Sequence, residues 1–555
     1  MMEIVNAKLK TAPCQGACPA GVDVPRYIRF LRAGQFTEAL SVVRESIPFP
    51  AVCAYACFHP CEVMCARKQY DEAISIRMLK RAAVEFADKD PVLPAVTATG
   101  HKVAVIGAGP AGLTAAYYLA GKGHQVTVFE KRAKPGGLMR YGIPEYRLPN
   151  VVVDRDIAMI RQRSVEIVTN TSVDTPVEMI AKGFAAVCVA TGAWESTGIT
   201  LPPLDASGDK SLTGAQSEAA VNGRVQVTEG LAFLEAVDTG EQLSVNGKVV
   251  VVGGGNTAID AARAAVRLGA EEATILYRRT RREMPASPEE IYDAEQEGVK
   301  FRFLAAPVKL GRGELICTKM TLADADGGGR LQPRPLENSE FGVECDRVIL
   351  AVGQTAAAAA CGLPAHPNGT AVTEAADTLA TPISRVFVTG DLVAGPSSVI
   401  ESIAQGRKVA TEIDKLLGGD GLIAEKWVTA KDEIAVDFAP MGQIRLGSQH
   451  IALEERTSSF QLAECGLDRQ AAMAEAGRCL GCDVHAYEVM VETAFCKDCG
   501  YCQEVCDQGV YQQSDDFNAQ GYRPMAVVGQ DKCVGCLKCL MICPDFALSV
   551  GNAAR

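Results

Sequence analysis

The residues best able to do chemistry in this sequence are its 21 cysteines, because most of them stand in clusters. Two C-x-x-C-x-x-C-x-x-x-C runs lie within residues 496–543, and Pro544 follows the second of them. Such paired runs are typical of proteins with two [4Fe–4S] clusters, in which the fourth cysteine of each run ligates the other cluster. Zinc ribbons use C-x-x-C pairs but not this run, so zinc is the weaker alternative. The predicted ligand sets are Cys496, Cys499, Cys502 and Cys543, and Cys533, Cys536, Cys539 and Cys506.

Further cysteines are grouped outside these runs, six of them within residues 14–65 and two in the pair Cys479–Cys482. The sequence starts without an apolar leader, and no stretch approaches the roughly 18 apolar residues of a membrane span. We therefore expect a cytoplasmic protein without a membrane anchor, whose clustered thiols stay reduced and bind metal. Five cysteines are scattered and are left without an assignment: Cys188, Cys317, Cys345, Cys361 and Cys465.

Length and composition limit the elements that can position these thiols. The chain has 555 residues, which at roughly 150 residues per domain predicts three or four domains. Its net charge of −12 argues against a nucleic-acid-binding protein, whose affinity would rest on lysine and arginine. Aromatic residues make up 6% of the chain, too few to suggest a stacking surface for single strands.

Residues 102–131 predict the first element that could hold a cofactor. A β-branched strand leads into Gly107-x-Gly109-x-x-Gly112, with Pro110 and Ala111 inside the turn; an alanine-rich helix and a second strand follow, ending at Glu130. The glycines permit a tight turn against a pyrophosphate at the helix N-terminus, and an acid at this distance can hold ribose hydroxyls. The pattern indicates a dinucleotide site; a glycine-bearing turn in another α/β domain is the alternative.

The same pattern returns at residues 248–286. The turn there is Gly253-x-Gly255-x-x-Ala258, with Asn256 and Thr257 inside it. The second strand ends in Arg278 and Arg279 instead of an acid, which favours the 2′-phosphate of NADP over the free hydroxyl of NAD. The alternative is a solvated charge run, because the basic residues continue past the strand.

Later segments return to the first dinucleotide domain. Residues 188–194 (CVATGAW) read as a strand end, and residues 386–410 read as a strand, a Gly-Asp turn and a helix. Asp391 in that turn is predicted to bind the ribityl chain of a flavin. The second nucleotide domain is therefore expected to be inserted within the first.

Four motifs add a family resemblance: GAGPAGL (107–113), PGGLMRYGIPEYRLP (135–149), GGGNTAID (253–260) and YRRTRREMPA (277–286). They resemble the small subunit of glutamate synthase, the corresponding half of dihydropyrimidine dehydrogenase, and the large subunit of NADH-dependent ferredoxin:NADP oxidoreductase. The resemblance implies FAD in the first site and NADP or NAD in the second. The FAD contacts it implies are Gly107, Gly109, Pro110, Ala111, Gly112, Glu130, Gly137, Leu138, Arg147, Thr191, Gly192, Gly390, Asp391 and Gln405.

The expected fold is multidomain α/β, with two Rossmann-like dinucleotide-binding domains, an N-terminal α-helical iron–sulfur domain and a C-terminal α+β two-[4Fe–4S] ferredoxin domain. The predicted divisions are 1–95 (helical), 100–235 and 346–420 (FAD-binding, in two parts), 236–345 (NAD(P)-binding), 421–485 (connecting) and 486–555 (ferredoxin).

The resemblance also suggests ligands for two N-terminal clusters, four [4Fe–4S] clusters in all. The relatives carry an RCLxC pair before the first motif, and here such a pair occurs only at Cys479 and Cys482. We therefore expect the connecting segment to return to the helical domain and complete a cluster with Cys14 and Cys65. The second cluster would use Cys18, Cys57 and Cys61. Its fourth ligand position matches Lys80, whose protonated amine has no lone pair, so Cys53 is the candidate, with a buried structural thiol as the alternative.

These parts together predict an FAD-dependent NAD(P)H oxidoreductase that exchanges electrons with ferredoxin or with a catalytic redox subunit, such as a 2-oxoacid:ferredoxin oxidoreductase. No catalytic side chain is expected beyond the cofactors, and a hetero-oligomer is expected. The alternatives are a subunit that feeds electrons to glutamate synthase, disfavoured by the added ferredoxin domain, and an electron-transfer scaffold without turnover.

Overall fold

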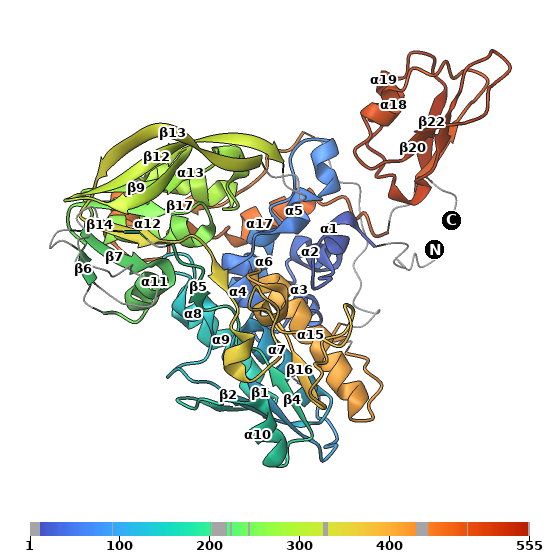
Figure 1. The fold of residues 1–555 in the computed structure, drawn as a ribbon. Helices are drawn as coiled ribbons and strands as arrows, with labels where there is room; N and C mark the ends of the chain where they lie inside the picture. Colours follow the sequence, from blue (N-terminus) through green and yellow to red (C-terminus); the bar gives the residue numbers. More distant parts are fainter. Residues whose placement is uncertain are drawn as a thin grey trace.

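The computed structural model describes residues 11–90, 93–199, 201–202, 219–221, 225–241, 243, 245–325, 331–423, 425–428, 442–484 and 487–552. Figure 1 shows a helical N-terminal part between two α/β units, with the C-terminal domain beyond it. None of the described helices combines the length and the apolar character that a membrane crossing requires.

A helical core forms the N-terminal domain. Its longer helices are α2 (Val24–Arg32), α3 (Phe36–Arg44), α4 (Pro50–Ala56) and α6 (Ile76–Phe86). Cys53 lies in α4 and Cys57 directly follows it, whereas Cys14, Cys18, Cys61 and Cys65 lie in or beside the short elements α1 (Pro13–Gly16), α5 (Pro60–Val63) and η1 (Ala66–Gln69). Proline stands in the first turn of α2 and α4, where a missing N–H costs nothing. Phe30, Leu40 and Leu79 belong to a hydrophobic core that continues into the first α/β unit through Tyr118 and Ile157.

The first α/β unit is a five-stranded parallel sheet in the order β16-β4-β1-β2-β3. Its strands are β1 (Lys102–Ile106), β2 (Gln125–Phe129), β3 (Glu166–Val168), β4 (Ala186–Val189) and β16 (Val386–Val388). Its helices are α7 (Pro110–Gly121), α8 (Leu138–Tyr141), α9 (Asn150–Gln162), α10 (Pro176–Ala181), α14 (Asp391–Ala394) and α15 (Val399–Leu416). α15 packs closely on α7, because a Cβ at Gly406 would lie 2.4 Å from the Ala111 carbonyl oxygen.

The second unit is a six-stranded sheet in the order β10-β9-β8-β14-β7-β6, parallel except at β6. Its strands are β6 (Ala219–Val221), β7 (Val225–Glu229), β8 (Lys248–Val252), β9 (Glu272–Tyr277), β10 (Lys300–Phe303) and β14 (Arg347–Leu350), and its helices are α11 (Gly230–Asp238), α12 (Asn256–Arg267) and α13 (Pro288–Gln296). An antiparallel sheet of β11 (Ala305–Leu310), β12 (Glu314–Ala325) and β13 (Leu331–Glu344) is attached to it.

Two boundaries of this inserted unit differ from the predicted divisions. β7 and β14 pair with each other and lie inside the second sheet, whereas the divisions at 235 and 345 assigned them to the FAD-binding parts. The difference arises because β7 and β14 are more than 100 residues apart in the sequence. Local turn patterns do not predict which distant strands pair. The chain crosses between the units at β5 (Glu195–Ser196) and β15 (Gln354–Thr355), which pair antiparallel.

The described part of the connecting segment contains β17 (Gln449–His450), α16 (Leu453–Ser458), β18 (Glu464–Cys465) and α17 (Arg469–Gly477). α16 lies on α12 of the second unit, and α17 packs against α2 and α6 of the helical domain. The C-terminal domain has two small antiparallel sheets with its own core. Its elements are β19 (Tyr487–Val491), α18 (Tyr501–Glu504), β20 (Tyr511–Gln513), β21 (Met525–Val527), α19 (Lys538–Ile542) and β22 (Leu548–Asn552).

Candidate functional site

A cavity of about 1630 Å³ lies between the two α/β units, and both glycine turns line it. The carboxyl ends of the parallel strands meet there, which is where open α/β sheets bind ligands. The predicted FAD contacts that line it are Gly107, Gly109, Pro110, Ala111, Glu130, Gly137, Leu138, Arg147, Thr191, Gly192, Gly390 and Asp391. From the second turn it is lined by Gly253, Gly255, Asn256, Thr257, Arg278 and Arg279.

The first turn requires glycine at two of its positions. Gly107 has φ +106°, and a Cβ there would lie 2.4 Å from the Ala190 carbonyl oxygen. Gly112 is outside the cavity lining, and a Cβ there would lie 2.1 Å from the Gly107 carbonyl oxygen. Gly112 therefore lets α7 approach β1, while Gly107 closes the turn at the N-terminus of α7.

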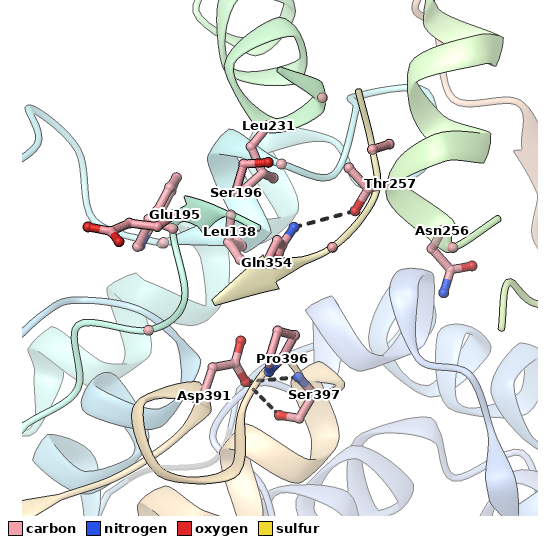
Figure 2. Close-up of a pocket in the computed structure, with 18 of the residues that line it drawn as sticks. Leu138, Glu195, Ser196, Leu231, Asn256, Thr257, Gln354, Asp391, Pro396 and Ser397 are labelled. Carbon is pink, nitrogen blue, oxygen red and sulfur yellow. Dashed lines mark hydrogen bonds between the residues drawn. The ribbon is translucent and has the colours of Figure 1, made fainter. Parts of the chain in front are cut away.

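Two carboxylates border the first site. The Glu130 carboxylate lies over the turn, because its Oε2 accepts a hydrogen bond from the Ala108 N–H (2.8 Å). Asp391 begins α14, and its Oδ1 accepts hydrogen bonds from the Ser397 N–H (3.1 Å) and hydroxyl (2.6 Å), as Figure 2 shows. Burial raises the pKa of the Asp391 carboxyl, an effect that the Ser397 hydrogen bonds oppose. Both acids are held by backbone groups at the cavity wall.

The second turn is shaped in the same way. A Cβ at Gly253 would lie 2.2 Å from the Ala351 carbonyl oxygen, and one at Gly254 would lie 2.5 Å from the Tyr277 ring. Asn256 begins α12, and its Oδ1 accepts from the Ser287 N–H (3.1 Å). Figure 2 shows Thr257 facing Gln354, whose Nε2 lies 3.5 Å from the Thr257 Oγ1. Ala258 is buried below the turn and does not line the cavity.

The two arginines after β9 have different surroundings. Arg278 is exposed at the cavity wall. Arg279 is 8% exposed, and its Nε donates to the Leu331 carbonyl oxygen (2.8 Å) at the start of β13. Arg278 therefore has the more open guanidinium for an anionic ligand, whereas Arg279 also ties β9 to the antiparallel sheet.

Arg147 and Gln405 have positions that differ from those of the other predicted FAD contacts. The Arg147 guanidinium is paired with Asp260 (2.7 Å) and Glu290 (2.8 Å) of the second unit. Its charge is thus used to join the two units, although it also lines the cavity. Gln405 on α15 is outside the cavity lining, and its Oε1 is buried without a hydrogen-bond partner among the described residues.

The cavity also contains polar residues that sequence patterns did not predict. Glu229 ends β7, lines the cavity and has a raised pKa because of burial. Arg132 lies over the Trp194 ring, 3.9 Å from its centroid, beside the crossing strand β5. The only sequence signal for Glu229 is its place at the end of a β-branched strand. That signal would point to the cavity only if the strand were assigned to the second sheet.

A small cavity in the helical domain is lined by the thiols of Cys14, Cys65, Cys479 and Cys482. The connecting segment is anchored beside it. Arg67 donates to the Arg478 carbonyl oxygen (2.8 Å), and Arg29 pairs with Asp483 (2.9 Å). Burial, and then the neighbouring thiols of Cys479, Cys65 and Cys482, raise the pKa of the Cys14 thiol well above its usual value. The fold thus brings together two cysteines near each end of the chain.

Lys80 on α6 has the remaining N-terminal thiols as its electrostatic neighbours. Burial lowers the pKa of its ammonium, but the thiols of Cys57, Cys53, Cys61 and Cys18 outweigh that effect and raise it. Cys53 is fully buried on α4. Ala56 and Phe58, the neighbours of Cys57 in the sequence, line the dinucleotide cavity. This thiol set therefore adjoins the site between the two α/β units.

The C-terminal domain brings its cysteines together in two sets. A second small cavity is lined by Cys496, Cys499, Cys502 and Cys543. In the other set, Cys539 and Cys506 are electrostatic neighbours of Cys536, and the Tyr511 hydroxyl donates to the Cys539 Sγ (3.0 Å). Cys533 and Cys539 are buried in the same core.

The chemistry of these thiol sets fits iron–sulfur clusters, which are held by four cysteine thiolates. Among the residues that the structure describes, no three His, Cys, Asp or Glu side chains converge closely enough to hold a single metal ion.

Three family models match the chain. Residues 101–406 match the pyridine nucleotide-disulphide oxidoreductase family. Residues 7–92 match domain II of dihydropyrimidine dehydrogenase, a 4Fe-4S cluster domain, and residues 495–547 match a 4Fe-4S dicluster domain. The expected fold class, with an N-terminal iron–sulfur domain and a C-terminal dicluster ferredoxin domain, is confirmed by these matches.

Several characterised proteins are similar over most of this chain. Subunit beta of the NADP(+)-dependent formate dehydrogenase of Moorella thermoacetica is 36% identical over 515 residues, covering 85% of this chain and 70% of that protein. Subunit beta of the NADPH-Fe(3+) oxidoreductase of Geobacter sulfurreducens is 34% identical over 526 residues, covering 85% and 75%. The glutamate synthase [NADPH] small chain of Azospirillum brasilense is 34% identical over 418 residues, covering 72% and 85%. The resemblance read from the motifs is confirmed.

Proposed function

This chain belongs to the pyridine nucleotide-disulphide oxidoreductase family, as an NADPH-dependent flavoprotein subunit with 4Fe-4S domains, and we propose that it exchanges electrons between NADP(H) and ferredoxin or a catalytic redox subunit. The observation that carries this proposal is that the dinucleotide cavity and the thiol set that contains Cys57 share a wall. Ala56 and Phe58 line the dinucleotide cavity and flank Cys57, so a thiol set lies next to the place where nucleotides would react.

The residues of the two turns have separate roles in this proposal. The first turn, Glu130 and Asp391 would hold FAD, with the pyrophosphate at the N-terminus of α7. The second turn would hold NADP, with Arg278 next to the 2′-phosphate. When bound, FAD supplies the conversion between two-electron hydride chemistry and the one-electron chemistry of clusters. The chain therefore needs to bind, orient and shield, and we assign no side chain to acid–base catalysis.

We propose four [4Fe–4S] clusters. The sets are Cys18, Cys53, Cys57 and Cys61; Cys14, Cys65, Cys479 and Cys482; Cys506, Cys533, Cys536 and Cys539; and Cys496, Cys499, Cys502 and Cys543. The lining of two small cavities by four thiols each supports two of these sets, and shared neighbours support the other two. Cys53 is the fourth ligand in the first set because the ammonium of Lys80 can only donate hydrogen bonds.

The partner is proposed to be another protein chain. Two relatives that each cover 85% of this chain are named as beta subunits, which supports a hetero-oligomer. A formate-oxidising subunit, by analogy with the Moorella relative, and a 2-oxoacid:ferredoxin oxidoreductase are two candidates. A glutamate synthase partner is weaker, because the similarity to that small chain covers 72% of this sequence against 85% for the others.

Anaerobic titration of the purified holoprotein with NADPH tests the proposal. We expect bleaching of the flavin absorbance, followed by paramagnetic signals from reduced clusters. An electron-transfer scaffold without turnover would show neither change with NADPH, while dithionite would still reduce its clusters.

A second measurement identifies the kind of acceptor. Oxidised ferredoxin, added with excess NADPH, should be reduced at a rate that depends on ferredoxin concentration. Reduction of the flavin and clusters without transfer to ferredoxin would instead favour a dedicated subunit as the acceptor.

A further inference from the structure

The C-terminal domain contacts the helical domain through residues that stand directly beside candidate cluster ligands. Gln69 ends η1, four residues after Cys65, and is 5% exposed. Its Nε2 donates to the Asp507 Oδ2 (2.7 Å), and its Oε1 accepts from the Lys538 Nζ (3.2 Å). Asp507 follows Cys506 in the sequence, and Lys538 precedes Cys539. The nitrogen and the oxygen of the buried Gln69 amide therefore both contact residues next to cysteines of one set of the C-terminal domain, Cys506 and Cys539.

Asp507 is the unusual residue of its run. The second run of the domain has Pro544 after its last cysteine, whereas the first run has Asp507 at the matching position. The side chain of a proline there would have no atom that could accept a hydrogen bond from Gln69. The departure from the repeated motif is thus accounted for by a contact with another domain.

Two tyrosines have cysteines of both neighbouring thiol sets close to them. The Tyr70 hydroxyl donates to the Val534 carbonyl oxygen (3.2 Å), next to Cys533. Burial and then Tyr487, Cys536, Cys482 and Cys533 raise the pKa of Tyr70, so this ring is adjacent to cysteines of both domains. Gly535 has φ +71°, and a Cβ there would lie 2.3 Å from Cε1 of Tyr487. The backbone between Cys533 and Cys536 therefore packs directly against Tyr487.

We propose that Gln69, Asp507 and Lys538 are positioning residues that fix the entry point for electrons into the C-terminal domain. The inference rests on the proposed function. With clusters bound, electrons would cross from the set of Cys14, Cys65, Cys479 and Cys482 to the set of Cys506, Cys533, Cys536 and Cys539, past Tyr70 and Tyr487. Each crossing would take one electron from the first site and deliver one to the second, with NADPH as the reductant. The set of Cys496, Cys499, Cys502 and Cys543 is then the exit.

The position of the exit set agrees with this order. Cys499 is exposed. Around the set, Phe546 is 85% exposed and Met541 87% exposed, so this end of the domain is open to solvent in the chain described. Figure 1 shows the C-terminal domain extending away from both α/β units, with the helical domain between.

The test compares holoprotein variants Gln69→Ala and Asp507→Ala with Asp507→Asn and Lys497→Ala. Asn keeps an oxygen that can accept from Gln69. Lys497 pairs with Asp545 (2.9 Å) beside Cys496, at the exit set, so its loss is a matched control for a surface ion pair of the same domain. Iron content and the rate of flavin reduction by NADPH are measured first and should be unchanged in all four.

Stopped-flow absorbance then follows reduction of the C-terminal clusters, which should slow about tenfold in the two alanine variants, as expected for mispositioned reaction partners. Electron paramagnetic resonance of the fully reduced protein should show weakened magnetic coupling between clusters, and limited proteolysis near residues 484–490 should be faster.

Asp507→Asn and Lys497→Ala should behave as the natural protein. Unchanged coupling and rates in the alanine variants, or an equal loss in Lys497→Ala, would overturn the inference. Failure of NADPH to bleach the flavin of the natural protein would instead contradict the proposed function.

Discussion

Single positive charges stand at two of the proposed cofactor sites, Arg278 at one and Lys80 at the other. Arg278 and Arg279 are adjacent in sequence but differ in exposure, and Arg279 already donates to the Leu331 carbonyl oxygen. A hydrogen bond between charged groups contributes roughly 1.5–3 kcal/mol, which corresponds to more than tenfold in affinity. We therefore propose that Arg278 serves the ligand, whereas Arg279 also supports the fold.

Replacement of Arg278 with Ala should raise the KM for NADPH about tenfold or more and leave the KM for NADH nearly unchanged, because only NADPH carries the 2′-phosphate. Arg279→Ala should instead lower the melting temperature, since it releases β9 from β13. Steady-state kinetics with both nucleotides and a thermal melt check the two results. Equal changes in both KM values for Arg278→Ala would contradict the assignment.

Lys80 provides the second charge. Its ammonium is buried among the thiols of Cys18, Cys53, Cys57 and Cys61, where a positive charge would favour the reduced, more negative form of the proposed cluster. Lys80→Met should therefore lower the midpoint potential of that cluster by at least about 60 mV, a tenfold change in equilibrium constant for one electron.

A redox titration followed by electron paramagnetic resonance measures this shift, with Lys80→Arg as the charge-preserving control. The iron content of Lys80→Met should equal that of the natural protein, because Cys53 is the proposed ligand. A loss of about four irons in Lys80→Met together with full occupancy in a Cys53→Ser variant would show that Lys80 and not Cys53 completes the site.

The connecting segment contributes a helix and two cysteines to the helical domain, although it lies about 400 residues later in the sequence. α17 packs against α2 and α6, and Cys479 and Cys482 follow it at the wall of the cavity that Cys14 and Cys65 also line. Buried partners support this placement: the Ser75 N–H donates to the Glu475 Oε1 (2.9 Å), and Arg29 pairs with Asp483. The helix and the two cysteines form one docked unit.

A double replacement of Cys479 and Cys482 with Ser should remove about four of about sixteen irons per chain, because each of four [4Fe–4S] clusters contains four. Iron analysis and the cluster absorbance measure the loss. Replacement of the scattered Cys317 and Cys345, both buried in the second unit, is the control and should leave the iron content unchanged. An unchanged count in the Cys479/Cys482 variant would exclude both residues as ligands.

Sequence patterns predicted the elements with local signals and missed those set by distant pairing. Both glycine turns follow their strands as expected, because the φ of Gly107 and the close approach at Gly112 leave no room for another residue. β7 was assigned to the wrong unit, since only its pairing with β14 reveals its sheet. The ion pairs of Arg147 with Asp260 and Glu290 likewise could not be predicted from a sequence motif, because they join residues more than 100 positions apart.

At the scale of the whole molecule, the thiol sets and the dinucleotide cavity follow one another from the α/β units to the C-terminal domain. Ala56 and Phe58 bring the first set to the cavity wall, and Cys61 is among the electrostatic neighbours of Cys14 in the second. Tyr70 then adjoins both Cys482 and Cys533. The domain order along the chain gives no hint of this spatial order, because the C-terminal domain is last in sequence but contacts the first domain.

Truncation near residue 490 tests the role of the C-terminal domain in this arrangement. We expect NADPH to reduce the flavin at the natural rate, since Cys479 and Cys482 remain, while electron transfer to ferredoxin or to a partner subunit falls sharply. Rapid kinetics with and without the acceptor measure both steps. Undiminished transfer would mean that the partner meets the helical domain instead.

Cys14 and Cys65 lie beside Cys479 and Cys482 in the fold. The thiol set can therefore be completed only after the ribosome has synthesised Cys482. Cys14 is made 465 residues before Cys479. At about 5–20 residues per second, the ribosome needs roughly 25–90 s to cover that interval. Throughout it, the nascent helical domain presents an incomplete thiol pair that oxidation could trap. In the proposed ligand assignment, metal loading at this position would be a late event of biogenesis, and a premature stop anywhere before Cys479 would leave the earliest-made domain without its full complement of iron.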